Sequence, residues 1–191
     1  MNLTQIPALL ISPRAGWQAL MADRPSTNRT FSNVALPFTL LPPAMILFAS
    51  GTVGAAHFPA IEAGMWELVA AVFLVAELLA IFLMAWAFDG SVRARGGKSD
   101  MNGAFLIAAI APLPLWISSL GLLSSSLSVA TGVALLGFIA SAVLIRHGVR
   151  SVLAAQHVVC PRQVSLRVIG YGMLTWIALA GIVLFPIVVL A

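Results

Sequence analysis

The residue with the clearest potential for chemistry is Glu77, a carboxylic acid in the middle of a long apolar stretch. An ionisable side chain inside a membrane segment is costly, and it often marks a proton path, an ion site or a contact between helices. No lysine or arginine lies in any of the apolar stretches of the chain. We therefore expect a neutral acid that donates a hydrogen bond. Hydroxyl groups at six positions are candidate partners: Thr39, Ser118, Ser119, Thr131, Ser141 and Thr175.

Two interpretations of Glu77 are open. The side chain could be a proton or cation site in a helix bundle, or it could join two helices through a hydrogen bond. The sequence contains no second charge in the same kind of environment, and polar side chains commonly hold membrane helices together. This favours the structural role.

Three more titratable residues lie near the start of the same stretch. Glu67 precedes Glu77 by ten residues, which places the two side chains about 80° apart around a helix, so we do not expect them to act as a pair. His57 and Glu62 are five positions apart, and two ligands are weak evidence for a metal site. We interpret His57, Glu62 and Glu67 as residues of the outer membrane interface, and we predict no metal site.

A cysteine and two histidines, Cys160, His147 and His157, lie in the segment that follows the fourth apolar stretch. A Cys/His nucleophile needs a third group to orient the base, and no acid is nearby in the sequence. We therefore predict no catalytic residues, and we expect no cofactor.

Prolines and small residues interrupt the apolar stretches. Pro112 and Pro114 remove two backbone N–H groups from the stretch 103–123, which predicts a kink that either shapes packing or borders a cavity. Two pairs of small residues four apart permit close approach of helices, within one chain or between two copies: Gly51 with Ala55, and Gly137 with Ser141.

The elements that position these residues are predicted to be membrane helices. Of 191 residues, 61% are hydrophobic and 8% are charged, whereas soluble domains have about 25% charged residues. Mean hydropathy is +1.04 along the chain. Five stretches approach the roughly 20 residues that span a bilayer: 34–56, 65–88, 103–123, 127–145 and 168–190. We predict an all-α integral membrane protein with a five-helix membrane domain, 34–191.

The basic residues predict the orientation. All ten lie in residues 1–33 or in the second and fourth gaps between the stretches, which five spans place on one side of the membrane. The positive-inside rule then puts the N-terminus in the cytoplasm and the C-terminus in the periplasm. The strong bias toward arginine and alanine is typical of GC-rich bacterial genomes, so we expect a bacterial inner membrane. The high pI follows from this topology and does not indicate nucleic-acid binding.

Two segments are predicted to lie at the cytoplasmic surface. Within the cytoplasmic segment 1–33, Ser12 and Pro13 begin a short amphipathic helix over 13–22. A second amphipathic segment extends the fourth span. We expect both to contact anionic lipid headgroups or a partner through four residues: Arg14, Trp17, Arg146 and Arg150.

Several of these features together resemble the Yip (Ypt-interacting protein) domain family, from about Ser12 to Phe185. They are the segment Ser12 to Trp17, the five closely spaced helices, Ala111-Pro112-Leu113 in the third span and Gly148-Val149 after the fourth. The match is closest to the small bacterial members. The resemblance implies five membrane helices, a cytoplasmic N-terminus and no established reaction.

The sequence also departs from the family pattern. Many members have Gly-Tyr shortly before the third-span proline, where this chain has Ile107 and Ala108. Eukaryotic members carry a longer N-terminal region associated with Rab-type GTPases, so a GTPase partner is not expected here. Our main hypothesis is a non-enzymatic interaction or membrane-organising module that binds itself or another membrane protein. The alternative is a small transporter or channel that uses Glu77.

Overall fold

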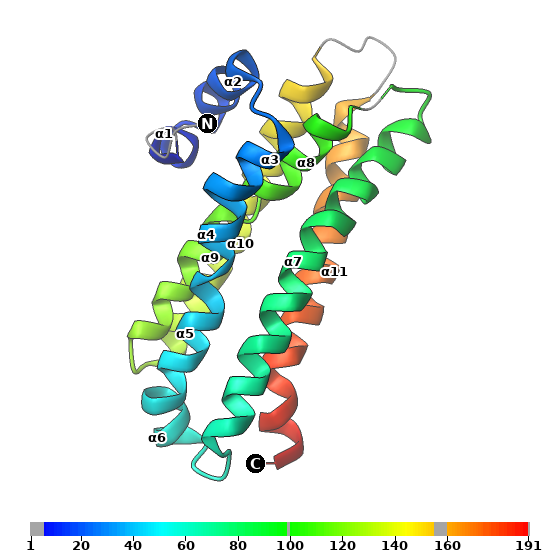
Figure 1. The fold of residues 1–191 in the computed structure, drawn as a ribbon. Helices are drawn as coiled ribbons and strands as arrows, with labels where there is room; N and C mark the ends of the chain where they lie inside the picture. Colours follow the sequence, from blue (N-terminus) through cyan, green and yellow to red (C-terminus); the bar gives the residue numbers. More distant parts are fainter. Residues whose placement is uncertain (1–5, 99, 155–159, 191) are drawn as a thin grey trace.

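The computed structural model describes residues 6–98, 100–154 and 160–190. Every regular element in these ranges is a helix. Successive spans run in opposite directions along an elongated bundle (Figure 1). Five helical segments are long and apolar enough to cross a membrane: Thr27–His57, Ala63–Arg93, Met101–Leu123, Leu127–Leu153 and Pro161–Val189. The predicted all-α membrane fold with five spans is confirmed.

Two short helices, α1 (Ile6–Ile11) and α2 (Pro13–Asp23), cover one end of the bundle (Figure 1). The sequence predicted only the second of them. They pack closely because Gly16 has no side chain: a Cβ there would lie 2.7 Å from the Cα of Leu9. The second helix ends at Arg24, which adopts a left-handed conformation with φ of 39°.

Helix α2 is anchored to the bundle by Trp17, whose side chain is fully buried. The indole ring lies against Gly148 in the fourth span, where a Cβ would come within 2.5 Å of a ring carbon. A glycine is therefore needed on the fourth span for α2 to dock in this position.

The first span is a continuous but irregular helix. It starts at Thr27, before the predicted position 34, because the Ser26 hydroxyl accepts a hydrogen bond from the Arg29 N–H at 3.4 Å. Wider π-type turns occur at two places, one of them just before Pro37, which lacks an N–H to continue the regular pattern. The segments in chain order are α3 (Thr27–Thr30), η2 (Phe31–Ala35), α4 (Leu36–Thr39), α5 (Leu41–Ala49), η3 (Ser50–Gly54) and α6 (Ala55–His57).

The second span is the single helix α7 (Ala63–Arg93), and the third is divided at its prolines. The third span consists of α8 (Met101–Ile110), α9 (Leu113–Ser118) and the 3₁₀ turn η4 (Ser119–Leu123). Every residue of α8 from Gly103 to Ile110 is buried, so this helix forms the centre of the bundle.

The last two spans are α10 (Leu127–Leu153) and α11 (Pro161–Leu190). The hydroxyl of Ser126 caps α10 by accepting the Val129 N–H at 3.5 Å. The amphipathic segment predicted after the fourth span continues α10 without a break. Pro161 suits the first turn of a helix, and α11 begins there rather than at the predicted 168.

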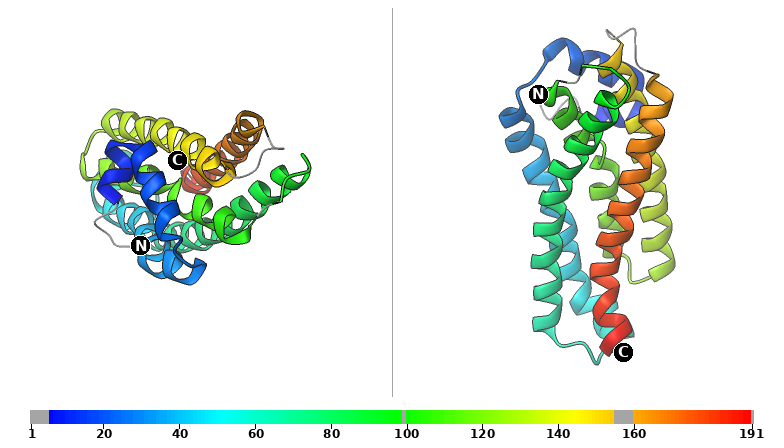
Figure 2. Two further views of the ribbon diagram at one scale, coloured as in Figure 1. Left: turned by 90° about the horizontal axis from the view of Figure 1, so that it is seen from above. Right: turned by 90° about the vertical axis from the view of Figure 1, so that its right-hand side faces the viewer.

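Packing is uneven across the five spans. Within the most hydrophobic part of the third span, 56% of the residues are buried. In the corresponding part of the fifth span, only 6% are buried. Helix α11 lies at the edge of the bundle against α7 and α10 (Figure 2). The fifth span is therefore the least buried of the five.

Candidate functional site

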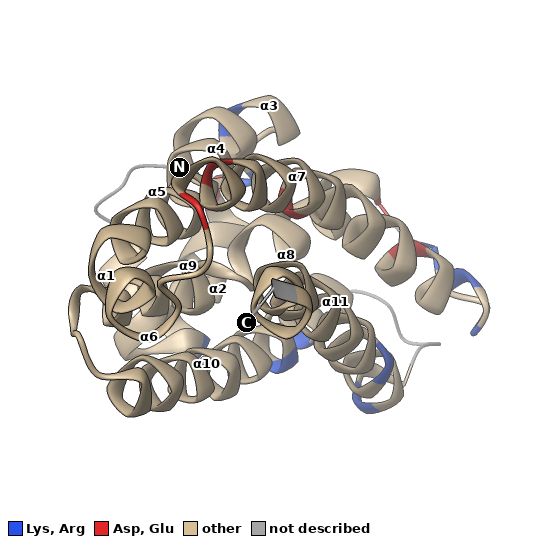
Figure 3. Ribbon diagram, turned by 90° about the horizontal axis from the view of Figure 1, so that it is seen from below, with Lys and Arg blue, Asp and Glu red and all other residues tan. Residues whose placement is uncertain are grey.

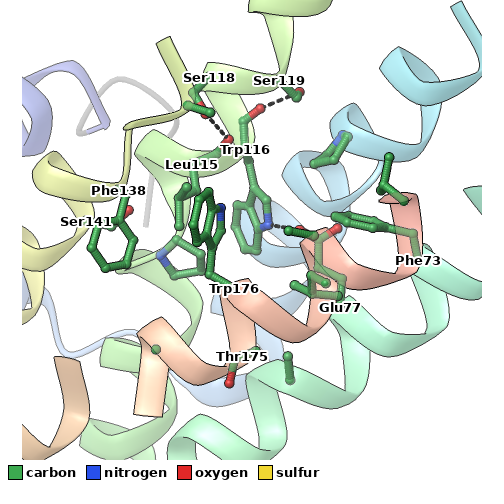
Figure 4. A pocket seen from close by; sticks show the side chains of 18 of the residues that line it. Phe73, Glu77, Leu115, Trp116, Ser118, Ser119, Phe138, Ser141, Thr175 and Trp176 are labelled. Atoms are coloured by element: carbon green, nitrogen blue, oxygen red, sulfur yellow. Dashed lines mark hydrogen bonds between the residues drawn. The ribbon is translucent and has the colours of Figure 1, made fainter. Parts of the chain in front are cut away.

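Glu77 lies in the middle of α7 and faces the interior, where it is 5% exposed. One of its carboxyl oxygens, Oε1, accepts a hydrogen bond from the indole Nε1 of Trp116 on α9 at 2.5 Å (Figure 4). The Trp116 side chain is also buried, at 1% exposure. The bond therefore joins the second and third spans deep inside the bundle.

A cavity of about 460 Å³ lies beside this pair, between α5, α7, α10 and α11 and the kinked third span. Its wall is mostly aliphatic and aromatic, including Phe138 and Trp176, whose ring centres are 5.6 Å apart (Figure 4). Among the lining residues that the structure describes, two have a buried polar atom without a hydrogen-bond partner: Glu77, at Oε2, and Ser141, at its hydroxyl. The residues around the cavity thus combine a mostly apolar wall with two buried, unsatisfied polar atoms.

The proline kink positions Trp116. Helix α8 ends at Ile110, and α9 begins just after Pro112, with Pro114 in its first turn. The Trp116 N–H donates to the Pro112 carbonyl at 3.0 Å and continues the span past the break. Because Pro112 borders the cavity, the predicted kink also shapes this space.

Five of the six hydroxyl residues proposed as neighbours of Glu77 line the same cavity: Ser118, Ser119, Thr131, Ser141 and Thr175. Two of these hydroxyls bond their own helix instead, Ser118 to the Leu115 carbonyl at 2.7 Å and Ser119 to the Trp116 carbonyl at 2.6 Å. The sixth, Thr39, donates to the Leu36 carbonyl at 3.0 Å. The partner of Glu77 is an indole N–H, which the sequence argument did not consider.

A comparison with protein families matches residues 8–158 to the Yip1 domain. This chain belongs to the Yip1 domain family. The family resemblance seen in the sequence is thereby confirmed, although the matched range ends before α11, whereas the resemblance was expected to reach Phe185. No curated protein and no solved structure matches the chain. The Yip1 region contains Glu77, Trp116 and Ser141, while α11 supplies one wall of the cavity from outside it.

The basic residues of this Yip1 domain protein belong to segments at the end of the bundle that α1 and α2 cover (Figure 1), and a view along the bundle shows them spread over several helices (Figure 3). Arg14, Arg146 and Arg150 are exposed there, as a contact with lipid headgroups requires. Trp17 is not: it was predicted to touch lipid or a partner, but its ring is fully buried against Gly148. Trp17 is therefore a packing residue, because its apolar ring fills the space above a glycine.

The residues predicted for the outer interface lie at the opposite end. His57, Glu62 and Glu67 are all exposed. His57 Nδ1 is 3.1 Å from the Val53 carbonyl of its own helix. Within the part of the chain that the structure describes, no group of three or more His, Cys, Asp or Glu residues could hold a metal ion.

The suggested Cys/His group is only partly described. Cys160 is exposed, and His147 Nδ1 lies 2.9 Å from the Val143 carbonyl one turn earlier in its helix. His157 lies outside the described residues. The residues that the described structure does bring together are Glu77 and Trp116, whose hydrogen bond joins two spans beside the apolar cavity.

Proposed function

We propose that this Yip1 domain protein is a non-enzymatic membrane module that associates with a second copy of itself or with another membrane protein. The observation that carries the proposal is the exposed outer face of α11. Only 6% of the most hydrophobic part of this span is buried. The face is therefore open to a neighbouring helix in the membrane.

The chemistry of this face suits contact between helices. Gly170 and Gly181 are eleven residues apart, which places them about 20° from each other around a helix. A Cβ added at either position would meet no atom within 4 Å. Exposed apolar residues, Ile177 at 50% and Val188 at 80%, share the same stripe. Small residues flanked by larger ones allow the close backbone approach that drives association in lipid.

The two small-residue pairs identified from the sequence play different roles. A Cβ at Gly137 would lie 2.7 Å from the Cβ of Ser118, so this glycine serves packing within the chain. Gly51 meets nothing within 4 Å, and Ala55 is exposed. The first span therefore offers a second, smaller contact surface.

We further propose that the basic end faces the cytoplasm, with the C-terminus in the periplasm of a bacterial inner membrane. The positive-inside rule supports this orientation, because all ten lysine and arginine residues belong to segments at that end. Arg14, Arg146 and Arg150 would contact anionic headgroups, each adding about 1 kcal/mol of attraction. A GTPase and nucleic acid form no part of the proposal.

Cysteine cross-linking in membranes tests the α11 contact. In a Cys160→Ser background, Ile177→Cys should give a disulfide-linked product, whereas Leu136→Cys, a 66% exposed position on α10, should not. A product of twice the chain mass identifies a homodimer, and a product of a different mass identifies another partner that carries a cysteine at the contact. Gly181→Leu should reduce the product severalfold, while Gly132→Leu, at an open glycine of α10, should leave it unchanged. Equal products from Ile177→Cys and Leu136→Cys would contradict the proposal.

A small transporter or channel is the second candidate, because Glu77 borders a cavity in the middle of the bundle. Such a protein should carry a proton- or cation-dependent flux in liposomes, and Glu77→Gln should abolish it. Wild-type liposomes without flux would remove this candidate.

A further inference from the structure

The cavity beside Glu77 has the properties of a binding site that the proposed helix association does not use. The association surface is the outer face of α11, whereas the cavity lies on its inner side. We propose that this cavity binds an uncharged, single-chain lipophile with a hydroxyl head group, a long-chain alcohol in chemical terms. The hydroxyl would pair with Glu77, and the chain would extend along the apolar wall.

The two unsatisfied polar atoms identify the head group. Oε2 of Glu77 and the hydroxyl of Ser141 are buried without a partner, and leaving a buried polar atom unbonded is costly. A carboxyl oxygen offers a donor or an acceptor according to its protonation, and a hydroxyl can match either. Trp116 already holds Oε1, so Oε2 is the atom left for a ligand.

The charge of the wall excludes an anionic head group. Among the lining residues that the structure describes, Glu77 is the single ionisable side chain, and lysine, arginine and histidine are absent. A fatty-acid carboxylate or a phosphate would therefore be buried next to a carboxyl group with no cation to compensate it. An uncharged hydroxyl avoids this penalty.

The size and position of the cavity fit a chain that enters sideways from the bilayer. Its volume of about 460 Å³ is within the usual range of small-molecule sites. Two of its lining residues on α10 are exposed: Leu127 at 41% and Leu135 at 50%. Both lie in the first part of α10 (Leu127–Leu153), whereas the basic residues Arg146 and Arg150 lie near its other end. A ligand can thus enter from the leaflet opposite the basic end and reach Glu77 head first.

Competition photolabelling of the purified full chain in nonionic detergent tests the proposal. The probe is a long-chain alcohol that carries a diazirine in its chain, and the readout is the labelling removed by excess unlabelled 1-dodecanol. Counting only the competable labelling corrects for the preference of diazirines for carboxyl groups. We expect saturable, competable adducts on cavity residues of α9, α10 and α11.

Matched competitors test the head group. The alkane n-dodecane should compete about fivefold less well than 1-dodecanol, the difference that one hydrogen bond makes. Dodecanoate, with an anionic head, should also compete less well. Better competition by dodecanoate or by dodecylamine than by the alcohol would overturn the assignment of an uncharged head group.

Variants test the location. Ser141→Leu removes one unsatisfied hydroxyl and fills the space, so competable labelling should fall at least about fivefold. Ala134→Leu narrows the cavity without touching a buried polar atom, and it should reduce labelling even where Ser141→Leu folds poorly. Ala140→Leu, on the exposed side of α10, is the control and should label like wild type.

No competable labelling of the wild type, or equal labelling of all three variants, would overturn the proposal. The Ile177→Cys cross-link should form whichever result is obtained, which separates this proposal from helix association.

Discussion

The hydrogen bond between Glu77 and Trp116 shows how a costly residue is accommodated in a membrane helix. One carboxyl oxygen accepts a hydrogen bond from a neighbouring span, and the same bond gives the buried indole N–H a partner, as buried indole N–H groups usually have. The same bond fixes one wall of the cavity. Substitution of Glu77 or Trp116 should therefore change both the stability of the fold and the proposed binding of a ligand in the cavity.

We expect Trp116→Phe to destabilise the folded protein by about 1 to 2 kcal/mol, because it leaves both oxygens of Glu77 without a partner. Unfolding in mixed detergent micelles measures the change. Trp86→Phe is the matched control, since Trp86 is 70% exposed and should cost little.

A double-mutant cycle separates the bond from the loss of ring area. In a Glu77→Leu background, Trp116→Phe should cost measurably less than in the wild type. An equal cost in both backgrounds would show that the bond contributes nothing to stability.

The sequence predicted the burial of Glu77 but not its partner. Its position in the middle of an apolar stretch was sufficient for the first inference, because position along a span sets depth in the bilayer. The partner depended on how the kink at Pro112 turns α9 toward α7, and spacing along the chain does not determine that rotation. A search for N–H donors as well as hydroxyls would have included Trp116.

At the scale of elements, α2 is attached to the bundle by one aromatic ring. Trp17 has the helical spacing of an amphipathic surface helix, and for this reason the sequence suggested a lipid contact. The structure places it against Gly148 instead. Because a glycine has no side chain, the large indole ring can approach the backbone of α10 closely at this position. Nothing in the local sequence around Trp17 specifies a partner so far along the chain.

Gly148→Ala should weaken this attachment by about 1 to 3 kcal/mol, because the new methyl group overlaps the indole ring of Trp17. Limited proteolysis of α2 and the unfolding midpoint report the effect. Gly132→Ala, at an open glycine of the same helix with no atom within 4 Å, should match the wild type or exceed it by up to about 1 kcal/mol. Equal behaviour of the two variants would be evidence against the docked position of α2.

At the scale of the whole molecule, the five spans follow from the sequence with little ambiguity. The apolar stretches and the grouping of basic residues both indicate five spans. Each stretch is a helix because lipid requires a span to satisfy its own backbone hydrogen bonds. The ends of the spans were less predictable. Ser26 and Pro161 start helices earlier than the apolar stretches do, since caps and prolines act on the backbone and not on hydropathy.

Labelling with a membrane-impermeant thiol reagent tests the proposed orientation. In intact cells the native Cys160 should stay unlabelled until the membrane is permeabilised, although its side chain is exposed. Ser125→Cys, in the exposed turn before α10 and in a Cys160→Ser background, should react at once. The opposite pattern would reverse the orientation.

The contact between Trp17 and Gly148 also sets an order of events during biosynthesis. Ribosomes make α2 before any span, but the glycine that receives its indole ring is made only near the end of the fourth span. The N-terminal helices must therefore wait, undocked, while the first four spans are synthesised and inserted. Their docking is a late step, and it closes one end of the protein only after those four spans are in the membrane.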